Sequence, residues 1–363
     1  MLFNKSSRIG SHSSNPIIFE RNTLTKSLHR EHMDISFHTN IELVRRVEDI
    51  KARIESTYYD GNQYIVVRDL PQDMVDSLSG GDGLVLGGRV FQFMFRGNTG
   101  VIRAPTLTWC RTITMRVASS ISRSMEKIGI PPIECKIPDD DDLIWYPKKD
   151  CGWSSMACFK TKVPTLTGEI EEGKTADYSF VPHRRFQRYE ETGQTAWPTI
   201  VIESGLCASL SRLREDAKWW LSRSQGEVRV VLVVTLYPGF RSLCVERWQL
   251  EHPPRWRFFR KRHKEGPPTY RIPPDIQKPC LVQKTIIRRS SIEGEDMVFP
   301  FEAIFDKSAK GRGNIVLSKK HCKSIQKSIK QEESTKEAEL INEEESEEDD
   351  EDDEDDEGLW DGL

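Results

Sequence analysis

Hydrophobic and polar positions along the chain predict a strand, a helix and a second strand between residues 196 and 236. The segments TIVIE and VRVVLVV are apolar almost throughout and rich in β-branched residues, which is typical of strands buried on both faces. Between them, apolar residues recur at helical spacing and form one stripe: Leu210, Leu213, Ala217, Trp220 and Leu221. The pattern therefore predicts a βαβ unit with two parallel strands.

The ends and flanks of this helix are also indicated. Ser209 is the expected N-cap, and Gly226 ends the segment before the next strand. At about 100° per residue, Asp216 and Lys218 fall on opposite flanks of the apolar stripe, so neither is expected at its centre.

Apolar spacing predicts further elements on both sides of this unit. The expected helices cover residues 41–54, 71–78 (a helical turn) and 111–128, and the expected strands cover 64–67, 90–95 and 243–250. A small hairpin or extended chain is expected around residues 281–287. The glycine-rich run GGDGLVLGG is not followed by Lys-Ser or Lys-Thr, so it indicates a loop and not a phosphate-binding P-loop.

Composition adds charged tails to this picture. Charged residues make up 30% of the 363 residues and hydrophobic ones only 37%, which predicts that part of the chain is disordered. Residues 343–357, EEESEEDDEDDEDDE, are acidic except for Ser346. Because 15 of the 57 acids lie beyond residue 342 and all 53 Lys and Arg precede it, residues 1–342 carry a net charge of about +11.

Several classes of protein are disfavoured. The eight cysteines form no C-x-x-C pair, and residues 1–15 contain no apolar signal region, so reduced thiols in the nucleus or cytoplasm are expected. No apolar run approaches the roughly 18 residues of a membrane span. The acids at 139–142 favour a solvated loop, and the pair His29 and His32 lacks the further ligands that zinc needs.

Two acids have positions that suggest chemistry. Glu203 ends the apolar strand TIVIE, where it either reaches solvent or a nearby arginine, or serves a ligand site at the strand end. The segment KTADYSFVPHRR alternates as one strand should, and Asp177 lies in this strand at the start of DYSFVP. We expect the two carboxylates, 26 positions apart, to meet at one end of adjacent strands.

This order of elements resembles the restriction-endonuclease-like, or PD-(D/E)XK, superfamily, and especially a large group of uncharacterised filamentous-fungal proteins with that core. The shared pattern is a helix (111–128), a strand bearing Asp177, a strand bearing Glu203, a helix (LSRLREDAKWWL) and a strand (VRVVLVVTL). The resemblance covers about residues 105–250. It implies an α/β fold with a mixed sheet flanked by helices.

The resemblance also implies a chemistry. Asp177 and Glu203 would hold Mg²⁺, which polarises a nucleic-acid phosphodiester, while a lysine stabilises the developing charge. The sequence departs from the family pattern, because Gly205 stands where the E-x-K lysine is expected and Ala176 replaces the proline before the first acid. Lys218 is either a migrated catalytic lysine or an ordinary lysine on the helix flank.

A basic segment follows the expected core. In RWRFFRKRHK, aromatic side chains alternate with six cations, namely Arg255, Arg257, Arg260, Lys261, Arg262 and Lys264. Cations neutralise phosphates and aromatics stack on bases, so contact with single-stranded nucleic acid is one interpretation. Nuclear import and a basic loop covering the core edge are the other two.

The expected organisation has five parts: a disordered basic tail (1–38), an N-terminal extension packed on the core (39–104), the PD-(D/E)XK-like core (105–252), a basic and Pro-rich extension (253–306) and a disordered tail ending in the acidic run (307–363). The leading functional hypothesis is an Mg²⁺-dependent nuclease. The alternative is a non-catalytic module on the same fold that binds nucleic acid or protein, and a scaffold recognised through its tails is the third.

The acidic run admits two interpretations of its own. It folds back over the basic surface and weakens nucleic-acid binding, or it is a solvated tail that improves solubility or docks basic proteins.

Overall fold

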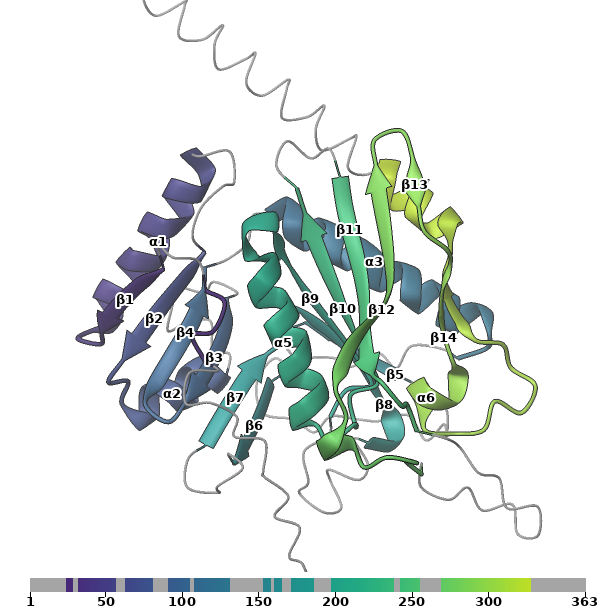
Figure 1. Cartoon of the computed structure of the whole chain (residues 1–363). Helices are drawn as coiled ribbons and strands as arrows, with labels where there is room; N and C mark the ends of the chain where they lie inside the picture. Colours follow the sequence, from purple (N-terminus) through teal and green to yellow (C-terminus); the bar gives the residue numbers. More distant parts are fainter. Residues whose placement is uncertain are drawn as a thin grey trace, which may run out of the picture.

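The computed structural model describes residues 24–28, 32–56, 63–80, 91–104, 108–130, 153–157, 160–164, 171–185, 197–237, 242–254 and 269–327. In these ranges the chain is a mixed α/β protein with two large mixed sheets and flanking helices (Figure 1). None of the helices in these ranges is both long and apolar enough to span a membrane.

The larger sheet has seven strands in the order β13-β12-β11-β10-β9-β8-β5. Its centre is the predicted βαβ unit, because β9 (Ile200–Leu206) and β10 (Val230–Leu236) pair in parallel and α5 (Leu210–Arg223) connects them. All other pairs are antiparallel, and the other strands are β5 (Trp153–Ala157), β8 (Tyr178–Pro182), β11 (Ser242–Leu250), β12 (Pro279–Arg288) and β13 (Ile292–Glu293).

Helices cover both faces of this sheet. α5 packs on one face against β9 and β10, and α3 (Thr108–Lys127) packs on the other face against β8 and β9 (Figure 1). Side chains of β9 alternate accordingly, so Ile200 and Ile202 join the cluster of α3, whereas Val201 joins the cluster of α5. Both faces are buried, as the continuous apolar run predicts.

The second sheet has six strands in the order β1-β2-β4-β3-β7-β6. Only β1 and β2 pair in parallel. The strands are β1 (Met33–Ser36), β2 (Tyr64–Arg68), β3 (Gln92–Arg96), β4 (Thr99–Arg103), β6 (Lys160–Pro164) and β7 (Glu171–Thr175), and the helices of this region are α1 (Asn40–Ser56) and α2 (Gln72–Gly80). One hydrophobic cluster contains residues of both sheets, so they share a core.

The segment KTADYSFVPHRR is not one strand. β7 ends at Thr175 and belongs to the six-stranded sheet, whereas β8 begins at Tyr178 and belongs to the seven-stranded sheet. The chain changes sheets at Ala176 and Asp177. The Thr175 hydroxyl contributes to the break, because it accepts a hydrogen bond from the Phe93 backbone N–H (2.8 Å) and so ties the end of β7 to β3.

The C-terminal region is more structured than the sequence predicts. β12 and β13 extend the large sheet, and the described chain continues through β14 (Met297–Phe299), α6 (Phe301–Phe305), β15 (Ile315–Leu317) and helical residues 319–327. Two 3₁₀ helices cover Cys207–Ser209 and Pro274–Ile276. The expected tails at 1–38 and 307–363 are therefore corrected where they contain β1, which pairs with β2, and β15, which pairs with β14 and packs on α3.

A buried charge cluster attaches this region to the core. Asp306 lies beyond α6, and its carboxylate pairs with Arg185 Nε (2.6 Å) and Arg229 Nη2 (3.3 Å). Arg185 also donates to the backbone oxygens of Trp197 (2.7 Å) and Glu227 (2.9 Å). The residues that enter β9 and β10 are thus joined to the C-terminal segment.

Replacement of Gly226 tests the predicted end of α5. Gly226 has φ +79°, and a Cβ there would lie 2.8 Å from Tyr270 Cζ, whereas Gly129 has φ +78° and nothing within 4 Å. We expect Gly129→Ala to cost about 1 kcal/mol through backbone strain alone. Gly226→Ala should cost roughly 2–4 kcal/mol because the clash adds to the strain. Urea unfolding measures both, and equal losses would contradict the packing at Tyr270.

Candidate acidic centre between the two sheets

Glu203 lies in the middle of β9 and not at its carboxyl end. The strand continues to Leu206, which corrects the sequence-based boundary. The side chain is fully buried on the α5 face, where the Trp220 Nε1–H donates a hydrogen bond to Glu203 Oε1 (2.5 Å). A carboxylate in this position is costly unless charged or polar neighbours stabilise it.

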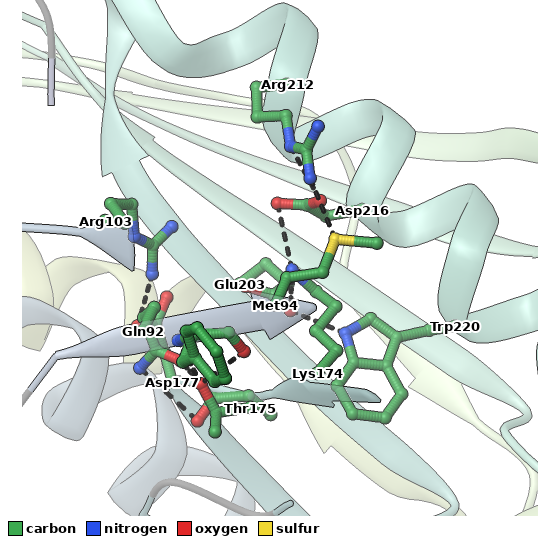
Figure 2. Close-up of polar contacts among 12 residues, drawn as sticks. Gln92, Met94, Arg103, Lys174, Thr175, Asp177, Glu203, Arg212, Asp216 and Trp220 are labelled. Atoms are coloured by element: carbon green, nitrogen blue, oxygen red, sulfur yellow. Dashed lines mark hydrogen bonds and ion pairs between the residues drawn. The ribbon is translucent and has the colours of Figure 1, made fainter. Parts of the chain in front are cut away.

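Asp177 is placed beside Glu203 by the strand register. β8 pairs Tyr178 with Ile202, so one further step along the two strands brings Asp177 next to Glu203. The Asp177 carboxylate accepts hydrogen bonds from Arg103 Nη2 (2.5 Å) and from the Ser204 backbone N–H (2.5 Å) and hydroxyl (2.9 Å). Both of its oxygens are therefore engaged by the protein (Figure 2).

The cation beside Glu203 is Lys174, from β7. Its ammonium lies 3.5 Å from Glu203 Oε1 and 3.1 Å from Asp216 Oδ2, and its side chain is only 6% exposed. Figure 2 shows it between the two carboxylates. The strand reads EEGKT, so no apolar pattern in the sequence indicated that Lys174 is buried. Its role became interpretable only with the change of sheet at Asp177.

Lys218 lies elsewhere. Its ammonium contacts Glu215 Oε1 (2.7 Å) and lies 5.9 Å from the centre of the Trp248 ring, and its side chain is 42% exposed. The structure thus brings together Asp177 and Glu203 but places Lys218 on the outer flank of α5.

Gly205, which stands where the E-x-K lysine is expected, lies against the side chains of Leu213 and Gln63. A Cβ at Gly205 would lie 3.3 Å from Leu213 Cδ1 and 3.7 Å from Gln63 Oε1. Gln63 is itself held in place, because its Oε1 accepts a hydrogen bond from Ser209 Oγ (2.8 Å). Ser209 therefore bonds to Gln63, and its side chain makes no cap hydrogen bond to α5. A long side chain at position 205 would have to displace α5.

Asp216 and Arg212 extend the centre along α5. Asp216 is buried and not on a solvated flank, and its Oδ1 lies 3.0 Å from Arg212 Nε. Arg212 also donates to the backbone oxygens of Leu24 (2.5 Å) and Lys26 (3.1 Å). At the last residue of the helix, Arg223 pairs with Glu172 of β7. This side of α5 thus faces the six-stranded sheet with charged residues.

Burial and neighbouring charges set the protonation of the centre. Burial raises the pKa of Glu203 to about 7, and the charges of Asp177 and Asp216 add to this rise, whereas Lys174 and Arg103 oppose it. Burial also favours the neutral form of Asp216, but Arg212 and Lys174 outweigh it and keep the pKa of Asp216 below its usual value. Burial acts to lower the pKa of Arg103, but Asp177 raises it above its usual value.

The donor set does not fit Mg²⁺ in this arrangement. Magnesium takes six ligands in octahedral geometry and usually keeps several waters. Here the Asp177 oxygens accept hydrogen bonds from Arg103 and Ser204. Glu203 is fully buried, and of its two carboxylate oxygens only Oε2 has no hydrogen-bond partner. Within the described ranges, no three Asp, Glu, His or Cys side chains are grouped as metal ligands. Protein cations neutralise the carboxylates instead.

A second polar surface lies on α3. Its outer face lines a hollow of about 840 Å³ that contains three exposed arginines, Arg111, Arg116 and Arg123, which we call the arginine strip. Thr112, Ser119 and Ser122 add hydroxyl groups, and Glu126 is the one acid in the described lining. The predicted nucleic-acid contacts between Arg255 and Lys264 lie outside the described residues, as do the acids at 139–142.

Comparison of the sequence with protein-family models finds no match, and comparison with curated proteins finds none either.

Replacement of the two lysines separates their roles. Lys174→Met leaves Glu203 and Asp216 buried without their shared cation, so we expect a loss of roughly 3–5 kcal/mol in unfolding free energy. Lys218→Met removes an exposed pair and should change stability by no more than about 0.5 kcal/mol. Denaturant unfolding of both variants measures the difference, and similar small losses would contradict a buried network centred on Lys174.

The pH dependence of stability tests Glu203. Because its folded pKa of about 7 lies above the usual 4.5, the neutral form favours folding, and wild type should lose stability relative to Glu203→Gln as pH rises from 5 to 8. The full effect is about 3 kcal/mol, from ~1.4 kcal/mol per pH unit.

Glu246 is the matched control, because it is equally buried. Burial acts to raise its pKa, but hydrogen bonds from Arg214 and Trp248 outweigh this and lower it. Its contribution to stability is present above its usual pKa and is lost as pH falls, so Glu246→Gln should show no such trend between pH 5 and 8. Thermal melts across this range measure both variants, and parallel curves for wild type and Glu203→Gln would refute the raised pKa.

Proposed function

We propose that this chain is a nucleic-acid-binding protein on a restriction-endonuclease-like core, in which the acidic centre has become a structural ion network. The observation that carries the proposal is the occupation of the centre by the protein's own cations. Arg103 binds Asp177, and Lys174 bridges Glu203 and Asp216 out of contact with water. A hydrolytic centre needs carboxylates that a metal ion can reach, and here Arg103 is bound to Asp177 and Lys174 lies against Glu203.

The arrangement of elements supports the core assignment. α3 is followed by an antiparallel pair, β8 and β9, beside which the two acids lie, and then by α5 and the parallel strand β10. This is the order on which the resemblance to the PD-(D/E)XK superfamily rests. Fold analogy does not assign activity, so the function is inferred from the site and the surface.

The arginine strip supports binding to a polyanion. At about 100° per residue, Arg116 and Arg123 lie on one side of the strip and Arg111 lies on the other, with hydroxyl groups between them. Arginine binds phosphate through two parallel hydrogen bonds, and serine and threonine donate further ones. The net charge of about +11 over residues 1–342 favours the same partner.

Hydrolysis is the second candidate because of one observation. Two acids and a lysine converge from β7, the β7–β8 junction and β9, and Glu203 Oε2 has no hydrogen-bond partner. This candidate requires a different arrangement of Arg103 and Lys174. It would be favoured if Mg²⁺ or Mn²⁺ raised the melting temperature and supported cleavage of labelled DNA or RNA, with both effects lost in Glu203→Gln.

Neutralising the arginine strip tests the binding proposal. For the variant Arg111→Gln, Arg116→Gln, Arg123→Gln we expect weaker binding to DNA or RNA and a slope of log K against log salt that is smaller by about 0.9 per lost phosphate contact. The matched control, Arg45→Gln, Arg53→Gln, Arg271→Gln, removes the same charge from exposed positions outside the strip and should bind more tightly than the strip variant. Fluorescence anisotropy at several salt concentrations measures both. Equal losses would show that net charge, and not the strip, controls binding.

A further inference from the structure

The arginines of the strip form no ion pair with the described residues. Arg111, Arg116 and Arg123 form no ion pair there, and Glu126, at the end of the strip, forms none either. Three arginines beside a hollow of about 840 Å³ therefore present a surface that is open to an anionic chain.

The described chain ends beside this helix. β15 packs on α3, and the Val316 backbone N–H donates a hydrogen bond to Ser124 Oγ (2.7 Å). The following helical residues 319–327 pack on the same core, since Cys322 and Ile325 join the apolar cluster that contains Ile121 and Met125 of α3. The described chain ends at Lys327, next to Gln326, whose Nε2 donates a hydrogen bond to the Arg288 backbone oxygen at the end of β12.

The sequence beyond this point has the complementary charge and sufficient length. Fourteen of the fifteen residues at 343–357 are acidic. The connection 328–342 spans up to about 50 Å when extended, at roughly 3.3–3.6 Å per residue. The 20 residues of α3 cover only about 30 Å, so the acidic run reaches the whole strip.

We propose that the acidic run 343–357 docks on the arginine strip of α3 and occupies it in place of an external polyanion. Carboxylates form two parallel hydrogen bonds with arginine, as phosphates do. Because the run is tethered to the same chain, its effective concentration at the strip is in the millimolar range, which compensates for the weakness of single exposed ion pairs. Competition with nucleic acid at this strip rests on the proposed function; docking of the tail does not.

Photo-crosslinking in the full chain tests docking directly and without nucleic acid. Benzoylphenylalanine in place of Met115, which lines the strip and is 40% exposed, should crosslink to residues 343–363. The same group in place of Ile41 on α1, which is 82% exposed, is the control. We expect at least about fivefold more crosslink to the tail from position 115 at ~50 mM salt, and a loss of this excess at ~500 mM salt, because salt screens exposed charges.

Three results would overturn the proposal: equal crosslinking from positions 115 and 41, crosslinks from position 115 that map to residues 131–150 and not to the tail, or a yield that salt does not change. A second measurement uses the chain lacking residues 343–363 and a synthetic peptide of residues 343–357. The peptide should bind at least about tenfold more weakly after Arg111→Gln, Arg116→Gln, Arg123→Gln than after Arg45→Gln, Arg53→Gln, Arg271→Gln. Equal binding by the two variants would also overturn it.

Nucleic-acid affinity then separates docking from the proposed function. If docking holds and the strip binds nucleic acid, removal of residues 343–363 should raise affinity at least about tenfold at low salt and little at high salt. If crosslinking succeeds and affinity is unchanged, docking stands and the proposed function of the strip fails.

Discussion

The buried ion pairs between α5 and β7 are the constraint on which the rest of the structure depends. α5 contacts the six-stranded sheet with apolar side chains, which cluster with Val66 and Met94, and also with the charged residues Arg212, Asp216 and Arg223. Buried charges are strongly destabilising when they lose their partners, and the partners Lys174 and Glu172 come from β7 of the other sheet. These ion pairs therefore act together with the shared apolar clusters to hold the two sheets in position.

Paired and unpaired charges lie in different parts of the described chain, the first around Glu203 and the second in the arginine strip. Where α5 meets the six-stranded sheet, the buried carboxylates are paired with cations, so their role is structural. On α3, by contrast, three arginines remain exposed to solvent. The buried acids thus help to join the two sheets, and the exposed arginines lie on a different helix.

Local patterns predicted much of this fold. The βαβ unit and the helices at α1 and α3 follow from apolar periodicity, and the proximity of Asp177 to Glu203 follows from the expected pairing of neighbouring strands. The change of sheet at Asp177 was not predictable, because KTADYSFVP alternates continuously while its partner strands are chosen by distant segments. The burial of Asp216 was missed for a related reason, since no pattern within α5 indicates that a second sheet lies over its flank.

The cluster of Arg185, Asp306 and Arg229 has a consequence for how the protein is made. Arg185 and Arg229 lie beside strands near the middle of the chain, but the carboxylate that neutralises them is 121 residues after the first and 77 after the second. Arg185 also pairs with Glu227, so Asp306 is the later of its two described carboxylate partners to be synthesised. A nascent chain that stops before Asp306 lacks the carboxylate that Arg185 and Arg229 share.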